Sequence, residues 1–145
     1  MIRFLEQKDL DNWTSLYNAY ANFYKVPMNK EILETLWRWI HDDSHIVNGI
    51  CYELKEKIVG IAHYRTMPRP IKGKYIGFLD DLFVDPDFRG QKIAQRLINH
   101  LESLSKDNNW DGIRWITHSS NENAKKLYDK IANNTGFELY ELKRN

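Results

Sequence analysis

Residues 79–94 read LDDLFVDPDFRGQKIA, and this stretch decides the fold. An apolar run over 75–84 is typical of a strand, and it stops at the turn signal Asp85-Pro86-Asp87. Beyond the turn, apolar residues recur at helical spacing over 93–104. The stretch therefore predicts a strand, a tight turn and a helix in direct succession.

The segments on either side predict two helices before the strands and an alternation of strands and helices after them. Aromatic residues at steps of three and four between positions 10 and 24 indicate the first helix, and Asn29 is a candidate N-cap for the second. The expected strands are 2–5, 46–54, 58–64, 75–84, 112–117 and 137–142, and the expected helices are 10–24, 32–40, 93–104 and 119–131. This order predicts a mixed α/β sheet in one domain over residues 1–145.

The composition fits a globular domain and excludes several classes of protein. The 145 residues are 42% hydrophobic and 13% aromatic, which is too apolar for a disordered chain. Twenty-one basic residues against twenty acidic ones leave a formal charge of +1, so the overall charge favours neither a nucleic acid nor a membrane as partner. The charged start of the chain and the single cysteine, Cys51, expected in the core, favour a cytoplasmic location.

Two cations and a glycine stand where the predicted helix begins after the turn. Arg89 and Lys92 are unfavourable at a helix N-terminus, which carries positive partial charge, unless an anion binds there. Gly90 lets the backbone approach such an anion, so the turn is a candidate phosphate or pyrophosphate site. A solvated surface turn is the alternative from this segment alone. The sequence lacks the G-x-x-x-x-G-K-S/T and G-x-G-x-x-G motifs, which argues against a nucleotide hydrolase or a dinucleotide oxidoreductase.

The strand at 79–84, the helix start at 89–94 and the later residues Asn121, Ala124 and Leu127-Tyr128 together resemble the GCN5-related N-acetyltransferase (GNAT) family. The family pattern Q/R-x-x-G-x-G/A binds the pyrophosphate of acetyl-coenzyme A, and residues 89–94 match it with a lysine in place of the glycine. The resemblance implies a mostly antiparallel central sheet flanked by about four helices. It also implies direct acetyl transfer from acetyl-coenzyme A to a primary amine, without a metal.

The resemblance assigns a role to each matching residue. Leu82 and Val84 would pair through their backbones with the pantetheine arm, with Phe83 facing away, and residues 90–95 would hold the pyrophosphate. Asn121 would bind the pantetheine region. The implied cofactor-binding set is Leu82, Phe83, Val84, Arg89, Gly90, Gln91, Lys92, Ile93, Ala94, Gln95, Asn121 and Ala124.

Two residues are candidates for the chemistry itself. By the resemblance, Tyr128 would stand near the sulfur as general acid, and full proton transfer from a phenol to the thiolate is uphill by about 2 kcal/mol at most. Asp80 occupies the position at which polyamine-acetylating relatives carry a carboxylate, and an apolar strand should raise its pKa towards that of a useful base. Neighbours on a strand point to opposite faces, so Asp80 and Asp81 are not expected to cooperate. Ser119 and Glu122 predict a capping box at the next helix.

The acceptor amine is left open by the sequence. Residues 127–140 resemble the branch that includes a yeast histone and polyamine acetyltransferase, so a polyamine, a small amine or amino acid, and a protein lysine are all compatible. A non-catalytic acyl-coenzyme A binding module is the alternative from another class, and nucleic-acid binding through Arg89 and Lys92 is disfavoured by the net charge. His41 and His45 lack a third ligand for a metal site. By analogy with the family, a homodimer is expected.

Overall fold

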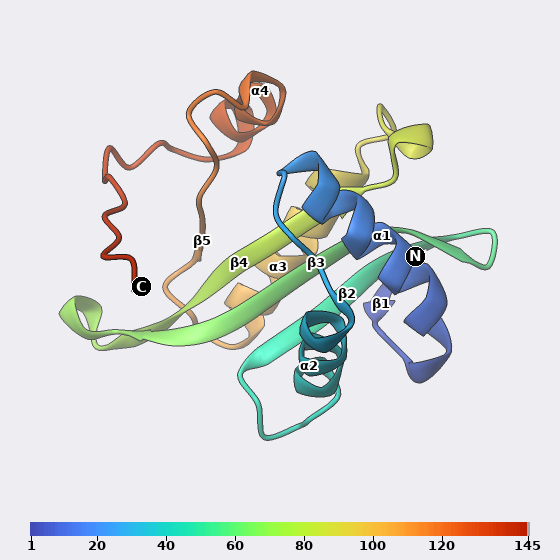
Figure 1. Cartoon of the computed structure of the whole chain (residues 1–145). Coiled ribbons are helices and arrows are strands. Elements are labelled where there is room, and N and C mark those ends of the chain that lie inside the picture. The colour runs from blue at the N-terminus through green and yellow to red at the C-terminus, as the bar shows by residue number, and fades with distance from the viewer. Residues whose placement is uncertain (145) are drawn as a thin grey trace.

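The computed structural model describes residues 1–144 and joins the strands in one five-stranded sheet of order β1-β2-β3-β4-β5 (Figure 1). Strands β1 to β4 run antiparallel to their neighbours, whereas β5 runs parallel to β4. The strands are β1 (Ile2–Phe4), β2 (Val47–Leu54), β3 (Lys57–Arg69), β4 (Lys74–Val84) and β5 (Ile113–Trp115), and the α-helices are α1 (Leu10–Phe23), α2 (Lys30–Ile40), α3 (Ile93–Asp107) and α4 (Glu122–Ile131). The prediction of a mixed, mostly antiparallel sheet with four helices is confirmed.

Helices cover both faces of the sheet. α1 and α2 lie over one face and α3 lies over the other (Figure 1). The aromatic stripe of α1 places Trp13 in one buried cluster with Trp37 of α2 and Phe83 of β4. Cys51 belongs to the same cluster, and burial raises the pKa of its thiol to about 12, which agrees with the predicted core position. Leu97 of α3 is fully buried in the cluster on the opposite face.

A bulge interrupts the alternation of side chains in β4. The pairing register with β3 shifts by one residue at Asp80, which has no direct partner there. Leu79 and Leu82 both pack on the α3 side of the sheet although they are three residues apart. The two residues between them share the opposite side, so Asp80 and Asp81 line the same cavity. The prediction that these carboxylates point to opposite faces was wrong, because the extra residue of a bulge is set by the pairing of two strands.

β5 touches β4 only at one end. Three residues of each strand are paired, from Gly77 with Ile113 to Leu79 with Trp115. A Cβ at Gly77 would lie 2.5 Å from Cδ1 of Ile113 and 3.1 Å from the ring of Trp110, so any other residue here would have to displace these side chains. Beyond β5 the chain departs towards α4 (Figure 1). No strand in residues 1–144 therefore covers this edge of β4 between residues 80 and 84.

Three segments differ from the predictions. β3 continues to Arg69, so the predicted loop after residue 64 is mostly strand. α4 begins at Glu122, which leaves Ser119 outside the helix and rules out the predicted capping box. The predicted strand at 137–142 is irregular, and its apolar side chains are 74–97% exposed. Alternating residues alone do not make a strand, and β5, the last strand of the sheet on this side, offers only a three-residue edge to pair with.

Each helix in residues 1–144 falls short of the length and apolar character that a membrane crossing demands.

Candidate functional site

The edge of β4 that faces β5 carries free backbone groups near its end. The Asp85 N–H donates to the Val59 carbonyl over 2.8 Å, which makes these two residues a hydrogen-bonded pair of the β3–β4 ladder. Such pairs alternate in an antiparallel ladder, so Phe83 bonds to β3 while the N–H and C=O groups of Leu82 and Val84 point away from it. The Val84 carbonyl accepts a hydrogen bond from Arg89, so an extended ligand can pair as an added strand with the N–H and C=O of Leu82 and with the N–H of Val84.

A cavity of about 540 Å³ lies beside this open edge. β4, the turn after it, the start of α3, the end of α1 and α4 form its wall. The lining residues are Phe23, Tyr24, Leu82, Phe83, Val84, Phe88, Arg89, Gly90, Lys92, Ile93, Ala94, Gln95, Asn121, Asn123, Ala124, Leu127 and Tyr128. The wall contains every member of the predicted cofactor-binding set except Gln91, together with the predicted acid Tyr128. The fold thus brings the predicted site residues of two separate segments, 82–95 and 121–128, to one cavity.

The start of α3 offers this cavity unpaired backbone amides. The first intrahelical bond runs from the Arg96 N–H to the Lys92 carbonyl over 3.0 Å, so the N–H groups of residues 93–95 have no acceptor within the helix. Lys92 is the N-cap and has φ +61°, in the left-handed region where the family pattern has glycine. Gly90 also has a positive φ, of +82°. This end of a 15-residue helix carries positive partial charge and can bind an anion.

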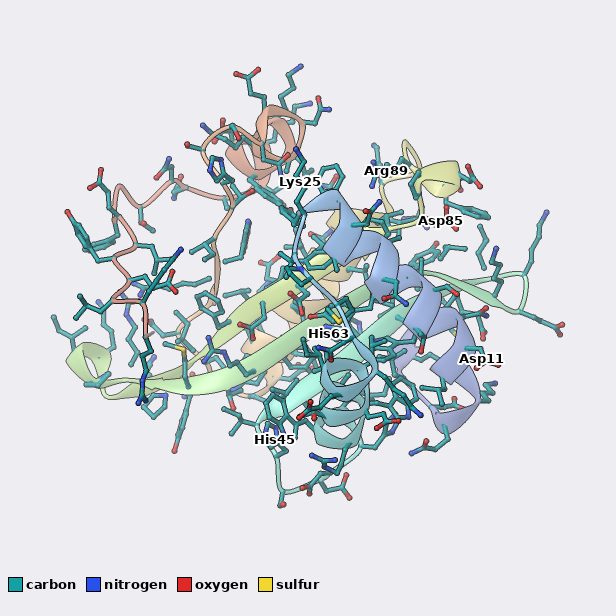
Figure 2. The ribbon with its side chains drawn as sticks, viewed as in Figure 1. Asp11, Lys25, His45, His63, Asp85 and Arg89 are labelled. Atoms are coloured by element: carbon teal, nitrogen blue, oxygen red, sulfur yellow. The ribbon has the colours of Figure 1, made fainter. Side chains whose placement is uncertain are left out.

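Arg89 lies against two aromatic rings at the end of β4. Its guanidinium carbon is 5.8 Å from the ring centre of Phe23 and 5.5 Å from that of Phe83. Its Nε donates to the carbonyl of Val84 over 3.3 Å. Figure 2 shows Arg89 close to Asp85, where β4 passes into the turn. Arg89 therefore joins the end of α1 to β4, and the bond to Val84 leaves its terminal nitrogens for an anion.

Asn121 and Tyr128 approach the same cavity from α4. The Tyr128 ring meets the Trp115 ring edge-on, with 5.3 Å between centres. Burial raises the pKa of Tyr128 to about 12, and Tyr24 adds to the effect, so this phenol stays a hydrogen-bond donor near neutral pH. The side-chain amide of Asn121 makes no capping bond and donates instead to Thr117 Oγ1 over 3.3 Å and to Tyr24 OH over 3.4 Å.

A second cavity, of about 680 Å³, lies on the α1 and α2 side of the sheet. Its lining residues are Tyr17, Glu31, Ile32, Thr35, Leu36, Trp39, His45, Ile46, Val47, His63, Arg65, Asp80 and Asp81. Three carboxylates face one guanidinium, and Arg65 Nε donates to Asp80 Oδ2 over 3.0 Å. Burial raises the pKa of Asp80, and the Arg65 pair opposes this only in part. The predicted base thus lies in an acidic cavity, apart from Tyr128.

A buried network around Asp81 was not found by sequence reasoning. His63 Nδ1 lies 2.8 Å from Asp81 Oδ2, and Tyr17 OH donates to the same oxygen over 3.0 Å. The Trp13 indole N–H donates to His63 Nε2 over 2.9 Å. Burial alone would raise the pKa of Asp81, but His63 and the hydroxyls of Tyr17 and Tyr20 outweigh it and hold this pKa below its ordinary value. Figure 2 shows His63 in the middle of the sheet, under α1 and α2. The one signal in the sequence was a histidine inside the apolar run 58–64.

Comparison with known proteins identifies relatives along almost the whole chain. The model of the acetyltransferase (GNAT) family matches residues 13–132. The chain is 26% identical over 147 residues to the D-amino-acid N-acetyltransferase HPA3 of Saccharomyces cerevisiae, covering 100% of this chain and 90% of the relative. It is 25% identical over 118 residues to the thialysine N-epsilon-acetyltransferase of Caenorhabditis elegans, covering 81% of this chain and 72% of the relative.

The fold is also shared with solved structures. The structure of AAC(6')-Iy in complex with the bisubstrate analogue CoA-S-monomethyl-acetylneamine matches with a TM-score of 0.84, covering 100% of this chain and 98% of that chain. The two sequences are 17% identical, so this likeness concerns the fold alone.

Proposed function

Because this chain belongs to the acetyltransferase (GNAT) family and is an acyltransferase, we propose that it transfers the acetyl group of acetyl-coenzyme A to a primary amine by direct attack. The observation that carries the proposal is the junction of the two cavities on β4. Asp81 belongs to the acidic cavity, and the next residue, Leu82, belongs to the cavity with the open backbone edge. An amine and a thioester bound in these cavities would meet beside one strand.

The smaller cavity suits an extended thioester that ends in a diphosphate. The N–H and C=O of Leu82 and the N–H of Val84 would pair with the pantetheine arm, and the amides of residues 93–95 with Arg89 would hold the pyrophosphate. Acetyl-coenzyme A supplies the activated acetyl group and a leaving thiolate. Tyr128, with a pKa of about 12, would stabilise that thiolate by donating a hydrogen bond, because full proton transfer would be uphill by about 4–5 kcal/mol.

The larger cavity suits a cationic amine, because it holds three carboxylates against one guanidinium. An ammonium group with a pKa of about 10.4 must lose a proton before it attacks, which costs about 4 kcal/mol near pH 7.4. Asp80, whose pKa is raised by burial, is the candidate base for this step. A second proton leaves the nitrogen as the amide forms and the thiol keeps one, so the net reaction releases one proton.

A screen of acceptors that measures free coenzyme A thiol tests this function. The panel contains spermidine, D- and L-amino acids, thialysine and a lysine-containing peptide, each with acetyl-coenzyme A. We expect at least one amine to raise thiol release above the rate without acceptor. A non-catalytic acyl-coenzyme A binding module would instead show stabilisation by acetyl-coenzyme A and no thiol release with any amine. If acetyl-coenzyme A gave no thermal shift and no heat of binding, both functions would be contradicted.

We further propose a homodimer of this one-domain chain in the cytoplasm. The side chains of Phe137, Leu139 and Leu142 are apolar and exposed, and contact with a second copy of the chain would bury them, which supports the dimer. The single cysteine, Cys51, is a buried free thiol, which suits a reducing compartment. Light scattering should give twice the mass of the 17.3 kDa chain. A monomer at micromolar concentration would contradict the dimer without affecting the proposed reaction.

A further inference from the structure

The Trp13–His63 hydrogen bond fixes which nitrogen of His63 carries its proton. An indole N–H can only donate, so His63 Nε2, 2.9 Å from Trp13 Nε1, must accept through its lone pair. The proton of the neutral ring is then on Nδ1, which donates to Asp81 Oδ2 over 2.8 Å. Both rings are buried, His63 to 1% exposure, so water does not compete for these bonds. Trp13 thus locks His63 as a donor to Asp81.

Asp81 uses only one of its two oxygens in this network. Oδ2 accepts from both His63 and Tyr17, and the Tyr20 hydroxyl also lies near enough to the carboxylate to lower its pKa. No donor in residues 1–144 meets the distance and angle of a hydrogen bond to Oδ1. The carboxylate is 19% exposed and lines the acidic cavity. A carboxylate held by two donors stays ionised, and one oxygen with free lone pairs at a cavity wall can accept a hydrogen bond from a cationic ligand.

The neighbouring carboxylate is in a different environment. Asp80 is 31% exposed and pairs with Arg65, and its pKa is raised where that of Asp81 is lowered. Glu31, Arg65 and His45 are the other charged or titratable groups of the cavity wall besides His63 and Tyr17. Two carboxylates whose pKa values are pushed apart by their surroundings are suited to different roles, one to take a proton and the other to remain charged.

We propose that Asp81 is the fixed negative charge that binds the acceptor's ammonium group through Oδ1, and that His63, locked by Trp13, is the residue that positions it. This inference rests on the proposed function, in which the acidic cavity takes the amine. The ammonium group bridges the two carboxylates, gives one proton to Asp80, and keeps an N–H bond to Asp81 that orients the lone pair of the neutral amine. His63 touches no substrate in this arrangement.

Two substitutions of His63 separate its two hydrogen bonds. His63→Asn keeps a side-chain N–H at the position of Nδ1 and so keeps the bond to Asp81. His63→Gln reaches the position of Nε2, where its oxygen can accept from Trp13, but gives Asp81 no donor. A positioning role through Asp81 predicts that His63→Asn retains amine binding and His63→Gln loses it. A role in packing alone predicts equal binding in the two variants, with differences only in melting temperature.

The measurement is calorimetric titration of the full chain with n-butylammonium chloride in the presence of coenzyme A. We expect wild type and His63→Asn to bind this probe, Asp81→Asn and His63→Gln to bind it roughly 10- to 100-fold more weakly, and coenzyme A affinity to change less than about twofold in all of them. Tyr17→Phe, which removes the second donor and keeps the ring, should weaken probe binding roughly two- to tenfold, and it replaces Asp81→Asn if that variant does not fold. Asp11→Asn, an exposed acid of α1, is the control for loss of charge.

The outcomes separate this inference from the proposed function. If coenzyme A binds but n-butylammonium gives no heat with the wild type, or binds Asp81→Asn as tightly, the assignment of Asp81 is wrong and the thioester site stands. Equal probe affinity in His63→Asn and His63→Gln would overturn the positioning role of His63. If coenzyme A itself does not bind, the proposed function fails first.

Discussion

The guanidinium of Arg89 donates from Nε to the carbonyl oxygen of Val84 over 3.3 Å while its plane lies against Phe23 and Phe83. The bond occupies the carbonyl of Val84, the last residue of β4, and the two rings hold the guanidinium in place. The cation is thereby held beside the unpaired amides of α3, at the place where a diphosphate would bind.

Arg89→Gln should weaken acetyl-coenzyme A binding by roughly tenfold, because a charge-assisted hydrogen bond to a phosphate and its cation–π support are both lost. Calorimetry with acetyl-coenzyme A measures the change. Arg96→Gln is the matched control, since Arg96 lies on α3, donates to Tyr52 OH and does not line the cavity. If the Arg89 variant and the wild type bound acetyl-coenzyme A with equal affinity, Arg89 would not contribute to binding the anion.

Tyr128→Phe should lower the rate of acetyl transfer by roughly 100-fold with little change in acetyl-coenzyme A affinity, which is the range for a lost hydrogen-bond donor to the leaving group. Because the pKa of Tyr128 is about 12, its ionisation should not produce a fall in rate below about pH 11. Thiol release measures the rate, and the exposed Tyr75→Phe is the control. Turnover at the wild-type rate in Tyr128→Phe would exclude the phenol from the reaction.

Lys92→Gly should stabilise the fold by about 0.5–1 kcal/mol, because Lys92 holds a left-handed backbone that glycine adopts without a steric cost. Urea unfolding measures the free energy. Lys92→Ala removes the same charge and keeps the strain, so the difference in stability between the glycine and alanine variants isolates the strain. If the glycine variant were no more stable than the alanine variant, backbone strain at this N-cap would not be the reason that the family pattern has glycine here.

Arg65→Gln should move the acidic limb of the pH–rate profile to higher pH. Burial raises the pKa of Asp80 and Arg65 lowers it, so removal of Arg65 leaves a higher pKa, and a base is active only above its pKa. The profile of kcat/KM from pH 4 to 9 measures the shift, with Arg38→Gln, an exposed arginine of α2 outside the cavity wall, as control. A limb that stays in place or moves to lower pH would show that Asp80 is not the titrating base.

Asp9→Asn should lower the free energy of unfolding by about 3 kcal/mol at pH 7, because Asp9 is 5% exposed and holds Arg3 through two bonds of 2.7 and 3.0 Å. Burial raises the pKa of Asp9, but the pair with Arg3 outweighs this effect and keeps that pKa below its ordinary value. The stabilisation is therefore present above about pH 4 and lost as the pH falls through the lowered pKa. Denaturant unfolding at pH 7 and pH 3, with Asp11→Asn as control, should show that the variant differs less from wild type at the lower pH.

Periodicity in the sequence was enough to predict the five strands and four helices, because patterns such as the apolar stripes of α1 and α3 are local. The mostly antiparallel pairing of the strands was implied by the family resemblance. The predicted cofactor-binding residues, apart from Gln91, gather in one cavity because most of them lie on β4, the turn after it and the start of α3, which follow one another directly. The bulge at Asp80 could not be predicted, because it depends on how β4 pairs with β3. The role of His63 was also hidden, since its partner Trp13 lies fifty residues earlier in the chain. The segment 137–142 shows the reverse case, an alternating pattern without a strand beside it.

Gly77 sets the spacing at the closed end of the gap between β4 and β5. A methyl group there would displace the end of the Ile113 side chain and press on the Trp110 ring, and a larger side chain would push β5 outward. The chain that follows β5 carries Asn121 and Tyr128, so a large side chain at this buried position, which lines neither cavity, would change the distance between β4 and the phenol of Tyr128. The geometry of the proposed reaction centre thus depends on the far end of the strand pair, through a residue that itself contributes no chemistry.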